Sequence, residues 1–338
     1  MSKGVQPTMN THAHSDRTAK PRISCIVPAY NEAANLPAVI PEISQQLHAL
    51  TDSFEIIVVN DGSRDNTLAV ANELAKDCPQ LVTLDLSRNF GKEAAMTAGL
   101  QASRGEIVIV MDADGQHPTN LLPLMVEKWR AGIDVVYAIR RTRSDQSSAY
   151  AFLTGWFYKL INWGSRVQIP RDAGDFRLMD RCVVDALLSL NEKNRFMKGL
   201  YAWVGFSSFA VDYEPLPRLQ GQSHFGIRGG IKLALTGMFA FSTAPLRLLT
   251  GAGLTLSLAS MAYILSVLFE YFYWGIKVPG YTTLVVSIMF FSGIQLLALG
   301  IMSAYVGRIY DEVKQRPIYL LKKRTGQGLP NPAVEPRP

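Results

Sequence analysis

Two carboxylates one residue apart, Asp112 and Asp114, directly follow the apolar run Glu106–Met111. If this run is a buried strand, its end holds both carboxylates in one place. Magnesium and manganese prefer such oxygen ligands, and a metal that also binds a diphosphate needs few of them from the protein. Gln116 can add an amide oxygen. The pair alone fits a helix cap or a solvated turn as well, so its meaning depends on the neighbouring motifs.

Polar residues also follow two earlier apolar runs. Tyr30 and Glu32 supply an aromatic ring on which a nucleobase can lie and a carboxylate that can bind the ribose or the base. Further on, Asp61 can accept a hydrogen bond from the nucleobase, and Gly62 lets the backbone come close. Each cluster is also what a turn before a helix contains, with Asn31 as a cap in the first. The two interpretations are compatible.

Short β-rich runs alternate with helical segments between residues 23 and 138. Runs typical of strands are Ile23–Pro28, Glu55–Asn60, Leu81–Leu86, Ile107–Met111 and Asp134–Ala138, and runs typical of helices are Leu36–Leu50, Thr67–Ala75, Lys92–Gln101 and Leu121–Ala131. This alternation predicts an α/β fold, a Rossmann-like and mostly parallel sheet with helices on both faces. Ligands of such sheets bind at the carboxyl ends of the strands. The polar clusters follow the first, second and fourth strands, so we expect one site.

Apolar residues are concentrated near the end of the chain. Of the 338 residues 48% are hydrophobic, and residues 248–269 and 281–307 contain no charge. Each stretch can cross about 30 Å of hydrocarbon, so we expect two transmembrane helices, at about 248–270 and 281–307. The basic flanks place the tip Tyr271–Gly280 outside and the N-terminal region in the cytoplasm. They also explain the net charge of +6 as contact with anionic head groups, and we expect no nucleic-acid partner.

The remaining segments complete the predicted organisation. The aromatic segment 149–165 is typical of either a core helix or an interfacial helix, and 227–241 of a juxtamembrane amphipathic helix. Beyond Leu320 we expect no structure, and the three cysteines form no CxxC pair, which argues against a zinc site. The predicted divisions are a disordered tail at 1–20, a cytoplasmic sheet domain at 21–225, an amphipathic helix at 226–245, two membrane helices at 246–308 and a basic cytoplasmic tail at 309–338.

Several ordered motifs resemble a known family. Pro28–Glu32, Val59–Ser63, Arg88–Lys92 and Asp112–Pro118 are similar to motifs of the family 2 inverting glycosyltransferases with the GT-A fold. The motifs Asp172–Leu178, Arg195–Leu200 and Gly221–Phe225 resemble the polyprenyl-phosphate branch of that family. This branch includes dolichol-phosphate mannose synthases and bacterial undecaprenyl-phosphate glucosyl- and aminoarabinosyltransferases. The resemblance covers roughly residues 22–320, and the two-span end is similar to the bacterial members.

The resemblance implies roles for the matching residues. Contacts with the nucleotide-sugar donor are implied for Pro28, Ala29, Tyr30, Glu32, Asp61, Lys92, Asp112, Ala113, Asp114, Gln116 and His224. A Mg²⁺ or Mn²⁺ ion on the diphosphate would be held by Asp112, Asp114 and Gln116. The acceptor phosphate would face Arg140, joined by Arg141, Arg143, Arg195 and Lys198. Asp172 and Asp175 would face the sugar and acceptor, where either one orients hydroxyls or acts as a base; the alternative is an Asp-Gly turn with an Arg177 ion pair.

The chain departs from the family pattern at three places. Asn60 stands where relatives often have a second aspartate, which weakens the assignment of position 60 but leaves Asp61. His224 stands where many have lysine, which makes the cation expected over the diphosphate pH-dependent. Tyr150 and Ala151 stand where basic residues are common, so we expect the acceptor phosphate to be held mainly by the arginines of 140–143.

The implied reaction is inverting transfer of a sugar to undecaprenyl or another polyprenyl phosphate at the inner membrane, for modification of a cell-envelope glycan such as lipopolysaccharide. UDP-glucose is the first choice of donor, ahead of UDP-galactose, UDP-aminosugars and GDP-mannose. The lipid phosphate is already anionic, so the reaction does not strictly need a general base. Relatives with this hairpin suggest a homo-oligomer such as a tetramer.

Two alternatives remain open. One is a processive or hydroxyl-directed membrane glycosyltransferase, against which the absence of a Gln-x-x-Arg-Trp motif speaks. The other is a non-catalytic membrane scaffold that binds nucleotide, against which the intact Asp61, Asp112, Asp114 and Arg140 speak.

Overall fold

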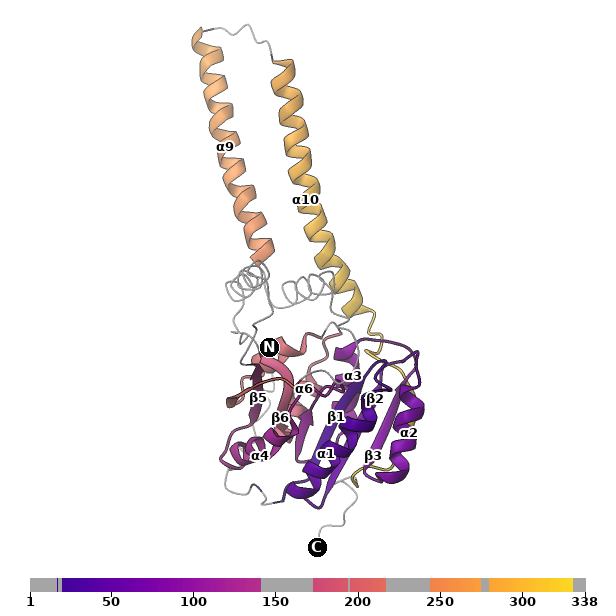
Figure 1. Cartoon of the computed structure of the whole chain (residues 1–338). Helices are drawn as coiled ribbons and strands as arrows, with labels where there is room; N and C mark the ends of the chain where they lie inside the picture. The colour runs from indigo at the N-terminus through magenta and orange to yellow at the C-terminus, as the bar shows by residue number, and fades with distance from the viewer. Residues whose placement is uncertain are drawn as a thin grey trace, which may run out of the picture.

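The computed structural model describes residues 17, 20–140, 173–193, 195–216, 244–274 and 280–330, and within them an eight-stranded sheet is covered by helices (Figure 1). The strands are β1 (Ile23–Ala29), β2 (Phe54–Asn60), β3 (Leu81–Leu86), β4 (Ile107–Val110), β5 (Val135–Arg140), β6 (Ala173–Asp180), β7 (Ser208–Tyr213) and β8 (Leu321–Thr325). The helices are α1 (Leu36–Leu50), α2 (Thr67–Asp77), α3 (Lys92–Ala102), η2 (Thr119–Leu121), α4 (Leu122–Arg130), α6 (Arg181–Ser189), α7 (Met197–Trp203), α9 (Ala244–Trp274) and α10 (Tyr281–Val313). The strand order is β7-β5-β6-β4-β1-β2-β3-β8.

The centre of the sheet, β4-β1-β2-β3, is parallel, as predicted. Every residue of β2, β3 and β4 is buried, and strands that are apolar on both faces are typical of parallel sheets covered on both sides. One hydrophobic core lies between the sheet and the helices α1 and α4, and a second lies between the sheet and α3, α6 and α7. The α/β fold and its layers are therefore confirmed.

Antiparallel pairings flank the parallel centre, so the sheet is mixed, with four parallel and three antiparallel strand pairs. Strand β6 runs antiparallel to both β4 and β5, while β7 is parallel to β5. Strands β6 and β7 come after the repeating strand–helix units. The long connection 141–172 separates β5 from β6, so the repeating pattern does not determine the direction of these later strands. Asp175 lies on β6, so this segment is a strand and not the Asp-Gly turn considered above.

The C-terminal segment also joins the sheet. Strand β8 pairs antiparallel with β3, so the prediction of no structure beyond Leu320 is wrong for these residues. After β8, the buried carboxylate of Glu55 accepts a hydrogen bond from the Leu329 N–H at 2.9 Å, and Arg104 Nη1 donates to the Leu329 carbonyl at 2.7 Å. The physical reason is that β3 would otherwise be an open edge, and β8 pairs its free backbone groups.

Two long helices, α9 and α10, extend from the sheet domain side by side (Figure 1). Within the residues that the structure describes, one stretch, Val286–Val313, is long and apolar enough to cross a membrane, with a mean hydropathy of 1.9 and 0% of it buried. Several side chains of α9 lie outside the described part, so the predicted span at 248–270 stays a prediction. The Lys193 N–H donates to Glu312 Oε1 at 2.8 Å, which ties the end of α10 to the sheet domain. The helices predicted at 149–165 and 227–241 fall outside the described residues.

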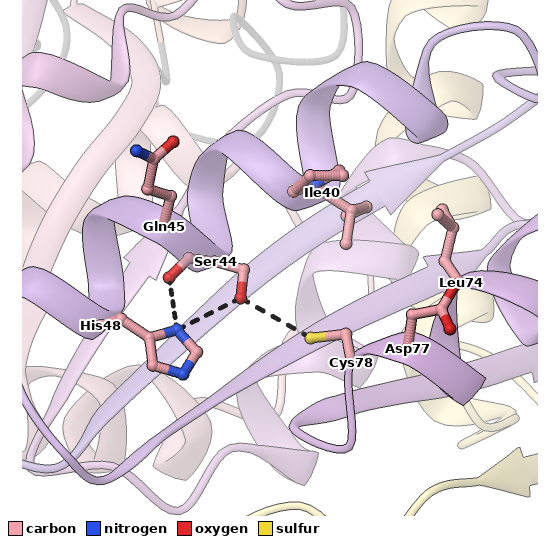
Figure 2. Close-up of a pocket in the computed structure, with 8 residues that line it drawn as sticks. Ile40, Ser44, Gln45, His48, Leu74, Asp77 and Cys78 are labelled. Carbon is pink, nitrogen blue, oxygen red and sulfur yellow. Dashed lines mark hydrogen bonds between the residues drawn. The ribbon is translucent and has the colours of Figure 1, made fainter.

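A small groove lies between α1 and α2, and Figure 2 shows its lining. Ser44 Oγ lies 3.4 Å from His48 Nδ1 and 3.8 Å from the free thiol of Cys78, and Ile40 and Leu74 add apolar surface. Ser44, His48 and Leu74 lie in the C-terminal halves of α1 and α2, and Cys78 directly follows α2. In a parallel α/β unit this end lies at the edge opposite the carboxyl ends of the strands, so the groove is separate from the polar clusters.

Candidate functional site

The carboxyl ends of β1, β2 and β4 meet at one edge of the sheet, as predicted. Ala29 and Asn60 are register partners at the ends of β1 and β2. The Asp61 N–H donates to the Ala29 carbonyl at 2.9 Å, and the Met111 N–H donates to the Ile26 carbonyl at 3.0 Å. The three polar clusters are therefore neighbours in space, at the end of the sheet domain that faces α9 and α10 (Figure 1).

The loops after β1 and β2 are joined by hydrogen bonds. Asn31 has a positive φ of 58°, its N–H donates to Ser63 Oγ at 3.0 Å, and its side-chain oxygen accepts from the Arg64 N–H at 2.8 Å. The Glu32 N–H donates to Thr67 Oγ1 at 2.8 Å. Asn31 thus bridges two loops, whereas the sequence suggested a helix cap. The bridge fixes the backbone between Tyr30 and Glu32.

Asp61 holds the loop that leads into α3. Its two carboxylate oxygens accept hydrogen bonds from the Phe90 N–H at 2.7 Å and the Gly91 N–H at 2.9 Å. Burial raises the pKa of Asp61, while these two N–H groups and Arg88 act in the opposite direction. Gly62 has φ +62°, and a Cβ there would lie 2.3 Å from the Arg88 carbonyl carbon. The Asp-Gly pair therefore shapes the loop 88–91, a role the sequence did not reveal.

Lys92, the first residue of α3, links the end of β4 to β6. Its ammonium lies 2.6 Å from Asp112 Oδ1 and 2.6 Å from Asp175 Oδ2. Burial by itself would lower the pKa of Lys92, but the two carboxylates raise it above its ordinary value, so the side chain is a cation. Burial would raise the pKa of Asp175, yet Lys92, Lys198 and Arg177 hold it well below its ordinary value. These three cations hold Asp175 in its carboxylate form.

The turn after β4 is held by its own residues. The Asp112 N–H donates to His117 Nδ1 at 3.0 Å, and the Gln116 N–H donates to Asp114 Oδ1 at 3.1 Å. The His117 ring stacks on Phe176 of β6, with ring centroids 4.8 Å apart. Burial lowers the pKa of His117, so the ring is neutral and can accept this hydrogen bond. The turn thus presents Asp112 and Asp114 from a fixed backbone.

Sequence reasoning missed Glu93, which lies beside this network. Burial and the charge of Asp175 raise the pKa of Glu93 to about 7, and its carboxylate accepts a hydrogen bond from the Met197 N–H at 3.2 Å. It therefore links α3 to the start of α7, which carries Lys198. Its place next to Lys92 in the first turn of α3 was the available signal.

Of the predicted acceptor residues, Arg140 and Lys198 lie near the cluster. Arg140 ends β5, and its register partner is Tyr213 at the end of β7. Burial raises the pKa of Tyr213, Arg140 lowers it, and Asp112 and Asp114 raise it. Arg195 differs, because it is buried and donates to the carbonyls of Leu187 and Leu190 at the end of α6. We therefore leave Arg195 out of the site. The remaining candidates Arg141, Arg143, Asp172 and His224 lie outside the described residues.

The carboxylates at the end of β4 fit a divalent cation. Asp112 and Asp175 already hold one positive charge between them, the Lys92 ammonium, so the site is arranged for cation binding. Asp114 lies on the same turn. Among the described side chains, no group of three or more His, Cys, Asp and Glu residues is gathered as a complete metal site. Gln116 takes part in the turn through its backbone N–H.

The chain is similar to known proteins over most of its length. The model of the family "Glycosyl transferase family 2" matches residues 24–188. An uncharacterized glycosyltransferase from Synechocystis is 43% identical over 304 residues, 90% of this chain and 96% of that protein. A prophage-derived bactoprenol glucosyl transferase from Shigella flexneri is 41% identical over 302 residues, 89% of this chain and 98% of that protein. A solved mannosyltransferase from Pyrobaculum calidifontis, in complex with GDP-Man and Mn²⁺, is 18% identical and covers 76% of this chain and 88% of its own, with a TM-score of 0.45.

Proposed function

The chain belongs to glycosyl transferase family 2 and is a glycosyltransferase, and on that premise we propose that it transfers glucose from UDP-glucose to undecaprenyl phosphate or a similar polyprenyl phosphate. The observation that carries the proposal is the cluster in which the Lys92 ammonium lies 2.6 Å from Asp112, which follows β4, and 2.6 Å from Asp175 on β6. The similarity to bactoprenol glucosyl transferases over about nine tenths of the chain supports the choice of acceptor and sugar.

The donor lies across the carboxyl ends of β1, β2 and β4 in this proposal. The nucleoside occupies the side formed by the loops of Tyr30 and Asp61, whose backbone is fixed by the hydrogen bonds of Asn31. The diphosphate lies toward Asp112 and Asp114. These two side chains would hold a Mg²⁺ or Mn²⁺ ion, which when bound neutralises the charge of the leaving diphosphate.

The nucleophile is an oxygen of the lipid phosphate. A bond forms between this oxygen and the anomeric carbon, the bond from that carbon to the diphosphate oxygen breaks, and UDP leaves with the electron pair. Attack from the opposite side inverts the anomeric centre. The lipid phosphate is already anionic, so no residue has to remove a proton from it. Asp175, whose pKa is held low, can therefore orient the sugar as a carboxylate. Arg140 and Lys198 bring the second anion to the site.

The long helices account for the choice of a lipid acceptor. A polyprenyl phosphate stays at the bilayer surface, because its apolar chain avoids water. We propose that α9 and α10 anchor the chain as a membrane hairpin, with the sheet domain on the cytoplasmic side. The exposed apolar side chains of α10 support this arrangement. The polar edge of the sheet faces these helices (Figure 1), so the site would open toward the head groups.

A transfer assay tests this proposal. Detergent-purified full chain is incubated with undecaprenyl phosphate, Mg²⁺ or Mn²⁺ and each of several radiolabelled UDP- and GDP-sugars, and label is measured in the organic phase. We expect label from UDP-glucose that is lost with EDTA. Asp114→Asn should lower the rate at least about 100-fold. The matched control is Asp52→Asn, which changes an exposed aspartate paired with Lys20 and should retain the rate.

The same assay separates the alternatives. Label in a polymer would indicate a processive enzyme, and label on a sugar hydroxyl would indicate a hydroxyl-directed one. Folded protein that binds UDP but labels nothing with any donor would contradict the proposed transfer and favour a non-catalytic scaffold.

A further inference from the structure

Lys92 occupies the position at which a metal ion would have to approach Asp112. The ammonium lies 2.6 Å from Oδ1 of Asp112, one of the two carboxylates that we propose for the metal. A Mg²⁺ ion bonded to that same oxygen, at about 2.1 Å, would lie within about 5 Å of the ammonium. Two cations at that separation repel strongly at a partly buried site. The free protein therefore disfavours the metal as long as Lys92 stays in place.

Lys92 can leave Asp112 once another anion offsets the loss of its two ion pairs. Lys92 is the first residue of α3 and follows Gly91, whose φ is +99°, and its long side chain is 37% exposed. The departure of Lys92 leaves Asp175 next to Lys198 and Arg177, which also lower its pKa. Asp175 would therefore keep positive neighbours. Asp112, in contrast, would be open to a new cation.

A diphosphate supplies what this exchange requires. Its negative charges attract the lysine away from Asp112 and offset the repulsion between the lysine and the metal. We propose that Lys92 is an internal counter-ion that makes metal binding conditional on the nucleotide: it holds Asp112 and Asp175 together in the free enzyme and moves to the diphosphate when donor and metal bind. This inference rests on the proposed function, because it takes the metal site at Asp112 and Asp114 from there.

A purely structural role of Lys92 predicts the opposite result. If the lysine only braces β4 against β6, its loss should loosen the carboxylates and weaken metal binding. If it competes with the metal, its loss should strengthen metal binding in the absence of nucleotide. The sign of the change therefore separates the two roles.

Binding of Mn²⁺ measures this sign without any turnover. The signal of free Mn²⁺ in electron paramagnetic resonance is recorded during titration of the full chain in detergent, with and without UDP. We expect wild type to bind Mn²⁺ weakly alone and more than about tenfold tighter with UDP. We expect Lys92→Met to bind Mn²⁺ alone about tenfold tighter than wild type and to gain little from UDP.

Two further variants serve as controls. Lys92→Arg keeps the positive charge and should keep both the weak binding and the gain from UDP. Lys20→Met makes the same change in an exposed ion pair with Asp52 and should match wild type. Tryptophan fluorescence, to which the buried Trp129 contributes, confirms that each variant is folded.

The outcomes for the two proposals are distinct. If wild type binds Mn²⁺ with UDP but folded Lys92→Met binds Mn²⁺ alone no tighter than wild type, the inference about Lys92 is overturned and the proposed metal site stands. If wild type takes up no Mn²⁺ even with UDP, the metal site itself is wrong, and the inference is overturned with it.

Discussion

Replacing Glu93 with glutamine should change how the stability of the protein depends on pH. The pKa of Glu93 is raised from 4.5 to about 7, first by burial and then by the charge of Asp175. A carboxyl group whose pKa is higher in the folded state stabilises the fold in its protonated form. Its contribution is complete below the unfolded pKa and is lost as the pH rises through about 7.

The magnitude follows from these two pKa values. Between about pH 5.5 and about pH 8 the linkage relation gives a loss of roughly 2 kcal/mol in the free energy of unfolding for wild type. Glutamine has nearly the same volume, can accept the hydrogen bond from the Met197 N–H, and does not titrate. The difference between wild type and Glu93→Gln isolates this one group, because all other titrating groups are shared.

Thermal unfolding followed by tryptophan fluorescence provides the assay. For a domain of this size, about 2 kcal/mol corresponds to roughly 4–8 °C in the unfolding midpoint. We expect wild type to lose this much relative to Glu93→Gln as the pH rises. The control is Glu73→Gln, which removes an exposed carboxylate paired with Lys76 on α2 and should follow wild type at every pH. Parallel curves for wild type and Glu93→Gln would refute the reasoning.

Three further changes test other parts of the site and fold. Gly62→Ala places a Cβ 2.3 Å from the Arg88 carbonyl carbon at a positive φ. This change should lower the free energy of unfolding by about 1–3 kcal/mol and weaken UDP binding measured by calorimetry. An unchanged affinity for UDP would contradict the donor assignment of this loop. Arg140→Ala should raise the KM for polyprenyl phosphate by about tenfold and leave the KM for the sugar nucleotide nearly unchanged. A change confined to the KM for the sugar nucleotide would contradict the acceptor role of Arg140. Glu55→Gln removes the charge that accepts from the Leu329 N–H; it should destabilise the fold by about 1–3 kcal/mol and expose the C-terminal segment to limited proteolysis, whereas wild-type protease resistance would show that this contact is dispensable.

The parallel centre of the sheet could be predicted from sequence because its information is local. The runs at 23–28 and 107–111 are short, β-rich and bounded by polar turns. The bounds of each run agree with those of an observed strand to within a residue or two. Strand β8 could not be found in this way. Its sequence, LKKRT, is basic and exposed, and it becomes a strand only because β3 offers it an unpaired edge. Such pairing depends on the finished sheet and leaves little trace in the segment itself.

The site was predictable to a similar extent. The convergence of the Asp61 and Asp112 clusters follows from the parallel topology, and the structure bears it out. The contact of Lys92 with Asp175 does not follow, because it depends on β6 returning antiparallel beside β4. Glu93 was missed for the same reason, since its environment comes from Asp175 on β6 and from α7. Long-range pairing decides these electrostatic neighbours, and a single sequence does not show it.

The position of β8 in the chain has a consequence for how the protein is made. The sheet domain is assembled from residues on both sides of the helical pair: β3 is synthesised early, and its partner β8 leaves the ribosome only after α9 and α10. Until then β3 presents an unpaired edge, which is a template for aggregation. Synthesis of the helices therefore precedes closure of the sheet, and nascent chains that stop before Leu321 would reach the quality-control machinery with that edge still open. Biogenesis thus has a built-in order, in which the sheet is completed only after both long helices have been synthesised.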